Sequence, residues 1–246
     1  MKIALLGYGK MGRIIEKIAI DRKHEIVLKI DQDNQHDLTA DNLHKADVAI
    51  EFSTPGTVLN NIEQCFNAHV PIVVGTTGWY GHLQQIKDEC TAGNNTLLYA
   101  SNFSVGVNIF FHVNEVLAKL MNSYPYYDVQ VEEIHHIQKM DSPSGTAITI
   151  AEGIINNLDT KSSWANILTD DSGTADDNLK ADQLLIESHR IENIPGTHTV
   201  IYSSEVDDIE IKHTAHSRAG FALGAVVAAE WVKDKKGFFS ITDIFE

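Results

Sequence analysis

The sequence predicts an α/β protein in which a doubly wound parallel sheet precedes a second, α+β domain with a mixed or antiparallel sheet. Two observations support this prediction. Strand-like and helix-like segments alternate as far as about residue 103, which is typical of a parallel sheet covered by helices. Beyond that point, strand-like segments follow one another with little helix between them, which indicates strands that pair without crossover helices.

The chain opens with a predicted strand, turn, helix and second strand. Residues 2–6 are a short apolar run that ends at a glycine. The apolar residues that follow have the spacing of one helix face: Met11, Ile14, Ile15, Ile18 and Ala19. Residues 25–30 form a second apolar-rich run, which Asp31 closes. Together these segments predict a βαβ unit.

The rest of the first domain continues the alternation. Buried strands are expected at residues 46–52, 71–74 and 96–100, because these short runs are almost wholly apolar. Helix-length segments flank them at residues 57–67 and 82–90.

The second domain has a different pattern. We expect helices at residues 108–121 and 146–157, and strands at 127–134, 198–203 and 208–213. A final apolar helix, residues 219–232, would return to the first domain. The predicted domains are therefore residues 1–103 with 217–246, and residues 104–216.

Charge and cysteine content exclude several classes of protein. The 246 residues include 19 Lys and Arg against 34 Asp and Glu, a net charge of −15 with neutral histidine, which opposes binding to nucleic acid or an anionic membrane. No apolar run is long enough to span a bilayer, so we expect a soluble protein. Cys65 and Cys90 have neither disulfide-scaffold nor zinc-ligand spacing, which favours a reducing, cytoplasmic setting. Residues 169–178 predict an acidic surface loop.

The first turn has the pattern G-x-G-x-x-G. It consists of Gly7, Tyr8, Gly9, Lys10, Met11 and Gly12. The first glycine permits the tight turn, the second lets backbone approach a pyrophosphate, and the third lets helix and strand pack. Between a strand and a helix, the pattern predicts a Rossmann-type dinucleotide-binding domain that holds an anion by backbone N–H groups and the helix dipole.

Asp31, at the end of the second strand, is placed to accept hydrogen bonds from the adenosine ribose, which favours NADH over NADPH. Lys10 and Lys29 are either ordinary solvated side chains or cations that attract the 2′-phosphate of NADPH.

The most informative cluster of polar residues lies at the start of the predicted helix at residues 146–157. It combines two histidines and a lysine with a helix-start turn: His135, His136, Lys139, Ser144, Gly145 and Thr146. Free N–H groups at such a turn bind carboxylates, a lysine adds positive charge, and histidines exchange protons near neutral pH. We interpret the cluster as an anion-binding catalytic site.

Other chemistries find less support. The remaining histidines have no metal-ligand spacing, so no metal is expected. Serines near His135 lack the G-x-S-x-G turn of a hydrolase. Trp79 either contacts a cofactor or covers a loop, and we favour the covering role.

The sequence resembles the bacterial 4-hydroxy-tetrahydrodipicolinate reductase family, also called dihydrodipicolinate reductases, over nearly its whole length. The resemblance rests on five blocks: residues 7–12, 51–53, 75–78, 101–108 and 133–147. It implies an oxidoreductase of lysine and diaminopimelate biosynthesis that uses NADH or NADPH to reduce 4-hydroxy-tetrahydrodipicolinate, a cyclic dicarboxylate, with loss of water and hydride addition at C4. It also implies a homotetramer formed through the second domain.

The resemblance also implies roles for individual residues. His135 and Lys139 match the family's catalytic histidine and proton donor, and His136, Gly145 and Thr146 match positions that bind the substrate carboxylates. The matching cofactor-binding positions are Gly75, Thr76, Thr77, Ala100, Ser101, Asn102 and Phe103. Arg218 matches an arginine near the return to the first domain, although a structural ion pair is an equal alternative.

Some positions depart from the family pattern. The glycine turn is one residue shorter than in many members, and Gln32 follows Asp31 where several members have arginine. The choice between NADH and NADPH therefore stays open. Two other functions also stay open: another NAD(P)-dependent amino-acid or semialdehyde dehydrogenase, and a non-enzymatic sensor of NADH.

Overall fold

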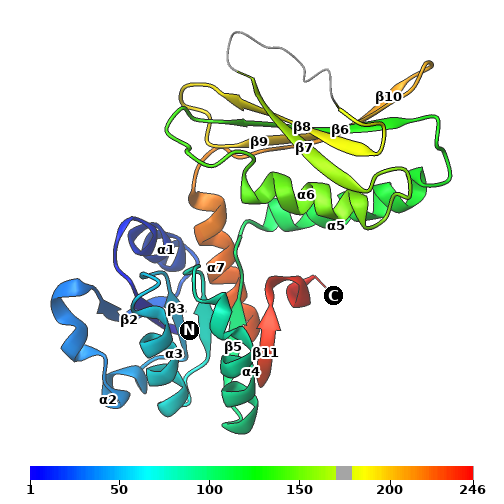
Figure 1. The fold of residues 1–246 in the computed structure, drawn as a ribbon. Helices are drawn as coiled ribbons and strands as arrows, with labels where there is room; N and C mark the ends of the chain where they lie inside the picture. The colour runs from blue at the N-terminus through cyan, green and yellow to red at the C-terminus, as the bar shows by residue number, and fades with distance from the viewer. Residues whose placement is uncertain (170–178, 246) are drawn as a thin grey trace. The chain divides into compact units, whose positions relative to one another are not determined.

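The computed structural model describes residues 1–169 and 179–245. Within these residues the chain divides into two compact units, which Figure 1 shows as ribbons. Unit 1 comprises Met1–Asn108 and Ala219–Glu246, and unit 2 comprises Ile109–Arg218. The predicted acidic loop at residues 169–178 lies outside the described residues except for Thr169, which ends a strand.

Unit 1 is built on a six-stranded sheet in the order β11-β5-β4-β3-β1-β2, and every neighbouring pair is parallel. The strands are β1 (Lys2–Leu6), β2 (Glu25–Ile30), β3 (Val48–Glu51), β4 (Ile72–Val74), β5 (Thr96–Tyr99) and β11 (Gly237–Ser240). The four central strands are almost wholly buried because helices cover both faces of the sheet. The predicted doubly wound parallel sheet is confirmed.

The helices of unit 1 form two layers. They are α1 (Lys10–Asp21), α2 (Ala40–Leu43), α3 (Val58–Asn67), α4 (Leu83–Ala92) and α7 (Ala219–Val232), with the short 3₁₀ segments η1 (Gln32–Asp37), η2 (Tyr80–His82) and η3 (Ile241–Ile244). Helices α1 and α7 pack with one face of the sheet in one apolar core, and α2, α3 and α4 pack with the other face in a second. Helix α7 thus helps to cover the sheet of unit 1, although it follows unit 2 in sequence.

Unit 2 contains a five-stranded mixed sheet in the order β10-β9-β6-β8-β7. Its strands are β6 (Asp128–His135), β7 (Ser163–Thr169), β8 (Gln183–Arg190), β9 (Thr197–Ser203) and β10 (Asp208–Thr214). Pairs β6–β8 and β7–β8 are parallel, whereas β6–β9 and β9–β10 are antiparallel. Helices α5 (Val105–Met121) and α6 (Gly145–Ile155) lie together along one face of the sheet (Figure 1) and share one apolar core with it.

The predicted elements agree with the structure to within about three residues at each end. Three strands were not predicted: β7, β8 and β11. In β7 the sequence SWANILT does not alternate apolar with polar residues, and β11 has only four residues at the edge of its sheet. Both therefore lack a periodic signal, and both are fixed by pairing with a neighbouring strand.

Among the described residues, no helix combines the length and the apolar character that a membrane span requires.

Candidate active site

The glycine turn has the geometry that its pattern predicts. Gly7 has φ +97°, and a Cβ there would lie 2.1 Å from the carbonyl oxygen of Phe52; a Cβ on Gly12 would lie 2.3 Å from the carbonyl oxygen of Gly7. A Cβ on Gly9, by contrast, would meet nothing within 4 Å. Gly9 is the N-cap of α1 and provides no side-chain cap, so the first N–H groups of the helix can bind an external anion. These residues fit a dinucleotide pyrophosphate.

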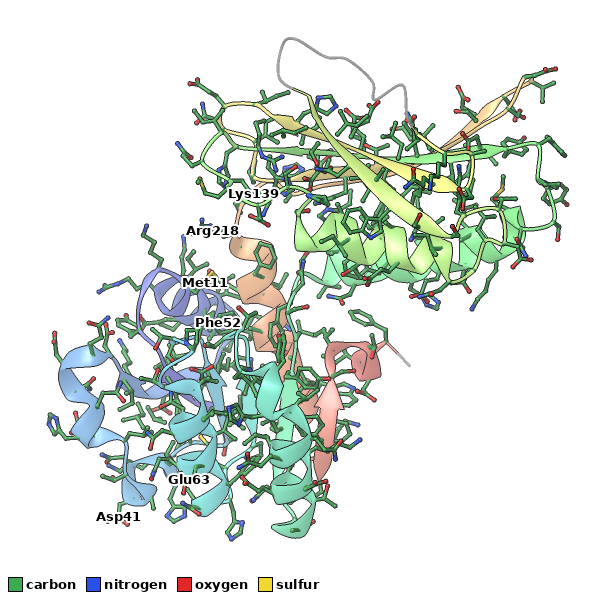
Figure 2. All side chains as sticks on the ribbon, viewed as in Figure 1. Met11, Asp41, Phe52, Glu63, Lys139 and Arg218 are labelled. Atoms are coloured by element: carbon green, nitrogen blue, oxygen red, sulfur yellow. The ribbon has the colours of Figure 1, made fainter. Side chains whose placement is uncertain are left out.

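The turn lies where the order of the parallel sheet reverses. Strands β1 and β3 are neighbours, while β2 continues the sheet on one side and β4 on the other. Ligands of such sheets bind beyond the carboxyl ends of the strands at this switch point. Met11 and Phe52 lie at this end of unit 1, whereas Asp41 and Glu63 lie at the opposite end (Figure 2).

A buried glutamate organises the loops after β3 and β4. Glu51 is the last residue of β3, and its Oε1 accepts hydrogen bonds from Ser53 N at 3.0 Å, from the Ser53 hydroxyl and from Asn61 Nδ2 at 3.2 Å. Ser53 N also donates to Thr76 Oγ1 at 2.8 Å. Burial raises the pKa of Glu51, against the opposing effect of these hydrogen bonds. The loop that carries Gly75, Thr76 and Thr77 is thereby fixed to the loop after β3.

Asp31 lies at the end of β2 and also starts the 3₁₀ segment η1. Its Oδ1 accepts a hydrogen bond from Gln32 N at 2.9 Å, and its own N–H donates to Asn34 Oδ1 at 2.7 Å. Lys29 Nζ lies 2.6 Å from a carboxylate oxygen of Glu16, so its charge is already compensated. Lys10 is exposed.

The segment 100–103 is held within unit 1. Ala100 and Phe103 are buried, whereas Ser101 is exposed and Asn102 is half-buried. Asn102 Oδ1 accepts from Ser104 N at 2.9 Å. Phe103 packs against Phe52 with ring centroids 5.7 Å apart. A Cβ on Gly224 of α7 would lie 1.6 Å from the Phe103 carbonyl oxygen, so this segment and α7 pack backbone to backbone.

The second predicted cluster joins the end of β6 to the start of α6 in unit 2. Alternation along β6 buries His135 and leaves Ile134 and His136 half-buried. Ser144 is the buried N-cap of α6, and its hydroxyl accepts from Ala147 N at 3.1 Å. Gly145 is exposed, and a Cβ there would meet nothing within 4 Å. The helix therefore presents an open N-terminal turn to a ligand.

A buried carboxylate connects this turn to the histidine. Ser144 N lies 3.1 Å from both carboxylate oxygens of Glu133, and Ser188 Oγ donates to Oε1 at 2.8 Å. Oε2 lies 3.3 Å from His135 Nδ1 and 3.7 Å from His198 Nε2. Burial opposes ionisation of Glu133, but the close contacts of His135, His198, Ser144 and Ser188 outweigh it and hold its pKa well below the ordinary value. Burial lowers the pKa of His198.

Lys139 lies in the loop between β6 and α6. Its Nζ donates to both carboxylate oxygens of Asp141 at 2.8 Å, and this contact lowers the pKa of Asp141. The Arg190 guanidinium binds the same loop from β8, because it donates to the carbonyl oxygens of Lys139 at 3.3 Å and of Asp141 at 2.7 Å. The loop is therefore anchored to the sheet.

Sequence analysis did not identify five residues of this site: Glu133, Asp141, Ser188, Arg190 and His198. Glu133 had a usable signal, since the alternation of β6 places it on the same buried face as Val129 and Val131. A carboxylate at a core position indicates a bound partner. Ser188 and His198 come from strands more than fifty residues away in sequence, and no local pattern indicates them.

Three of these groups have the arrangement of possible metal ligands. Single atoms of Glu133, His135 and His198 all lie within 4.8 Å of one another. However, the carboxylate already accepts hydrogen bonds from Ser144 N and Ser188 Oγ, and Arg190 Nη1 lies 3.5 Å from Oε1. A cation here would meet the positive charge of Arg190, so we retain the expectation that no metal binds.

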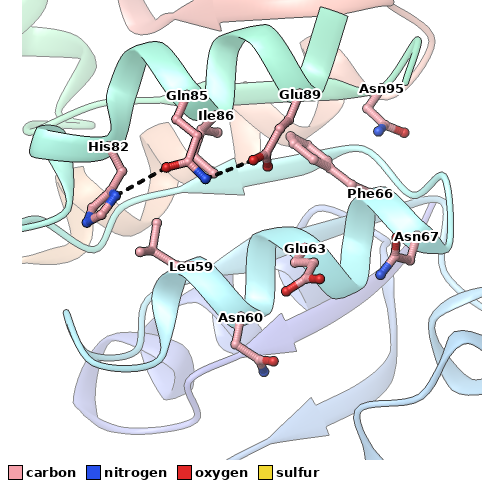
Figure 3. A pocket seen from close by; sticks show the side chains of 10 residues that line it. All are labelled: Leu59, Asn60, Glu63, Phe66, Asn67, His82, Gln85, Ile86, Glu89 and Asn95. Atoms are coloured by element: carbon pink, nitrogen blue, oxygen red, sulfur yellow. Dashed lines mark hydrogen bonds between the residues drawn. The ribbon is translucent and has the colours of Figure 1, made fainter. Parts of the chain in front are cut away.

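A hollow of about 510 Å³ between α3 and α4 contains none of the predicted site residues (Figure 3). Its lining includes Glu63 and Glu89. Two carboxylates would repel the phosphates of a dinucleotide, so the hollow is not a candidate for the cofactor.

Comparison with known proteins identifies the family. A model described as dihydrodipicolinate reductase, N-terminus, matches residues 1–103, and one described as dihydrodipicolinate reductase, C-terminus, matches residues 106–245. The chain belongs to the dihydrodipicolinate reductase family.

Similar proteins of known name support this family membership. A 4-hydroxy-tetrahydrodipicolinate reductase of Christiangramia forsetii is 49% identical over 245 residues, which cover 99% of this chain and 97% of the relative. One of Neisseria gonorrhoeae is 31% identical over 268 aligned positions, with 99% and 97% covered. The solved dipicolinate-bound dihydrodipicolinate reductase of Paenisporosarcina sp. TG-14 has the same fold, with TM-score 0.76, 23% identity and 98% and 97% coverage.

As a member of the dihydrodipicolinate reductase family, the chain is an oxidoreductase that reduces 4-hydroxy-tetrahydrodipicolinate to tetrahydrodipicolinate with a nicotinamide cofactor, in lysine and diaminopimelate biosynthesis. The alternatives of another dehydrogenase and of an NADH sensor are therefore wrong. The cysteines agree with this outcome, because Cys65 and Cys90 are buried and burial raises the pKa of both thiols, that of Cys90 to about 11. A thioester-forming dehydrogenase needs a reactive thiolate.

Two residues on which the sequence left alternatives open can now be described. Trp79 is buried and its Nε1 donates to the Thr76 carbonyl oxygen at 2.8 Å, as expected of a residue that covers a loop. Arg218 is exposed just before α7 and forms no salt bridge with the parts of the chain that the structure describes. The structural ion pair, one of the two alternatives for Arg218, is thus not found there.

Proposed function

We propose that His135 and Lys139 are the catalytic residues of this reductase, and that His136 with the Ser144, Gly145 and Thr146 turn binds the substrate carboxylates. One observation supports the proposal above all: within unit 2, the carboxylate of Glu133 lies 3.3 Å from His135 Nδ1 and accepts from Ser144 N at the start of α6. An acid–base group and an anion-binding turn therefore lie at one place, as reduction of a cyclic dicarboxylate requires.

The nicotinamide cofactor binds unit 1 in this proposal, and when bound it supplies the hydride. The pyrophosphate would lie on the turn formed by Gly7, Tyr8, Gly9, Lys10, Met11 and Gly12. Asp31 would accept from the ribose, while the loops at residues 75–77 and 100–103 would line the remainder. NADH is the preferred form, with NADPH also accepted, because Asp31 repels a 2′-phosphate and Glu16 already compensates Lys29. Unit 1 is then the cofactor domain and unit 2 the substrate domain.

The chain's own residues account for the acid–base part of the reaction. N–H groups of the α6 turn and the His136 ring hold the two carboxylates and orient C4 for hydride addition. Loss of the 4-hydroxyl group as water, together with a proton of the neighbouring carbon, leaves an α,β-unsaturated imine. Addition of hydride to this imine builds negative charge on the substrate. The Lys139 ammonium and the His135 imidazole stabilise that charge, and one of them delivers the proton.

The assembly is proposed to be a homotetramer formed through unit 2, working in the cytoplasm. Helices α5 and α6 cover one face of its sheet, and in the described residues no helix covers the other (Figure 1). Half-buried side chains of β6 on that other face include Gln130, Glu132 and Ile134. Light scattering on a size-exclusion column measures the mass, and a monomeric mass would contradict the homotetramer.

The catalytic proposal is tested by the loss of absorbance at 340 nm when the protein meets NADH and the freshly made condensation product of pyruvate and aspartate semialdehyde. We expect rapid loss with NADH and slower loss with NADPH. Dipicolinate, which is bound in the related structure, should inhibit by occupying the α6 turn. No loss with either cofactor would contradict the proposal.

A further inference from the structure

We infer that Glu133 is a positioning residue of the active site: its buried carboxylate holds the His135 imidazole in one tautomer and fixes the substrate-binding turn of α6 beside it. The inference rests on the proposed roles of His135 and of residues 144–146, and it adds a residue that touches neither substrate nor cofactor.

Every polar neighbour of Glu133 can donate to it. Oε1 faces Ser144 N at 3.1 Å, Ser188 Oγ at 2.8 Å and Arg190 Nη1 at 3.5 Å. Oε2 faces Ser144 N at 3.1 Å, and it also faces the two imidazoles. The carboxylate is fully buried, so it has no alternative partners in water. An ionised side chain, which accepts hydrogen bonds and donates none, is the form that satisfies all of these neighbours.

An ionised Glu133 determines which nitrogen of His135 holds the proton of the neutral ring. Nδ1 lies 3.3 Å from Oε2, and its alignment falls short of a full hydrogen bond, so the attraction is that of a negative charge for an N–H dipole. A proton on Nδ1 is favoured there, while a lone pair on Nδ1 would be repelled. Nε2 is then the nitrogen that gains and loses the catalytic proton. Gly196 leaves it room, because a Cβ there would lie 3.1 Å from Nε2.

The same carboxylate determines where α6 begins. The Ser144 N–H points at both oxygens of Glu133, while the Ser144 hydroxyl caps Ala147 N. Gly145 and Thr146 follow directly, so their positions depend on that anchor. Although nine residues separate His135 from Gly145 in sequence, one side chain thus fixes both.

Charges around Glu133 support this role. The groups that face it are His135 on its own strand, Arg190 on β8, His198 on β9 and, more distantly, Asp141, whose charge Lys139 compensates. His198 is buried and its lowered pKa keeps it neutral near pH 7. Glu133 can therefore compensate a positive charge on His135 during turnover.

The test is Glu133→Gln, compared with Glu205→Gln as matched control. Gln keeps the size of the side chain but places an NH₂ donor against Ser144 N–H or His135 Nδ1. We expect kcat to fall about 100-fold, while KM for NADH changes less than about threefold, since the cofactor binds unit 1. Glu205 is exposed in the turn after β9 and has no part in the proposed site, so its variant should keep wild-type kcat. Wild-type kcat in Glu133→Gln would overturn the inference.

A second measurement holds even if Glu133→Gln does not fold. The ¹⁵N chemical shifts of histidine rings in the wild-type protein report the tautomer, and His135→Gln assigns the His135 signals by removing them. At a pH where His135 is neutral, we expect the proton on Nδ1; a proton on Nε2 would overturn the inference. This measurement needs no substrate, so a contrary result would overturn the inference alone. The proposed function is tested separately, by turnover of the wild-type protein.

Discussion

The ammonium of Lys139 lies 2.8 Å from both carboxylate oxygens of Asp141. The Lys139 side chain is 20% exposed and that of Asp141 is 63% exposed, so water screens the pair only in part. The positive charge that the proposed mechanism offers to an anionic substrate is therefore already compensated in the free protein. A dicarboxylate has to share this ammonium with Asp141 or displace it.

Asp141→Asn should therefore strengthen binding of dicarboxylates. The gain is limited by the modest energy of a partly exposed ion pair, so we expect the Kd of dipicolinate to fall about threefold. Isothermal titration calorimetry measures this Kd. Glu192→Gln, which removes one exposed carboxylate from the loop after β8, is the control for net charge and should leave the Kd unchanged. Equal shifts in both variants would mean that long-range charge, and not the Lys139 contact, controls affinity.

Removal of either proposed catalytic group should slow turnover. His135→Ala and Lys139→Ala are each expected to lower kcat by about 100-fold or more, the usual contribution of a general acid. Steady-state oxidation of NADH at 340 nm provides the measurement. Lys212→Ala removes an exposed lysine of β10 and serves as control with wild-type kcat. Near wild-type turnover in both test variants would refute the assignment.

Asp31 should determine the preference between cofactors. Asp31→Asn keeps an oxygen that can cap Gln32 N, so η1 should stay intact while the negative charge disappears. We expect the KM for NADH to rise by about threefold and the KM for NADPH to fall, because a 2′-phosphate is no longer repelled. Asp33→Asn, at an exposed site two residues later, is the matched control. If the two KM values change in parallel, Asp31 does not contact the ribose.

Local patterns predicted the fold and pointed to part of the candidate site. The G-x-G-x-x-G turn could be recognised because its glycines are required by contacts close in sequence, such as Gly12 against Gly7. The placement of His135 at a strand end followed from the alternation of β6. In each case the periodicity of one element determines the position.

The supporting residues could not be predicted in the same way. His198 comes close to Glu133 only because β9 pairs antiparallel with β6, in a register that sets Glu133 opposite His198. Ser188 lies opposite Glu133 from the other side, where β8 pairs in parallel. The register between strands is a tertiary property, and a single sequence contains no periodic signal for it.

The pKa values of two buried glutamates are shifted in opposite directions, and such shifts make the stability of the fold depend on pH. Glu133 has a lowered pKa because donors surround it, whereas burial raises the pKa of Glu51, whose Oε2 finds no donor among the described residues. A carboxyl group whose pKa is higher in the folded than in the unfolded state stabilises the fold. This contribution is complete at pH values below the unfolded-state pKa of 4.5. As pH rises above 4.5, the unfolded state ionises first, so the stabilisation decreases until the folded-state pKa is passed.

Glu51→Gln should therefore be tolerated and should remove this pH dependence. Its amide oxygen can still accept from Ser53 N and Asn61 Nδ2. Because glutamine does not ionise, the free-energy cost of burying a charged carboxylate is absent. At pH 7 we expect a free energy of unfolding at least equal to that of the wild type, whereas Glu51→Ala should lose about 3 kcal/mol through a cavity and unpaired donors. Urea denaturation between pH 4 and 8, followed by circular dichroism, measures both. A Glu51→Gln protein as unstable as Glu51→Ala would mean that Glu51 acts as a buried anion, and the pH slope of the wild type would then have the opposite sign.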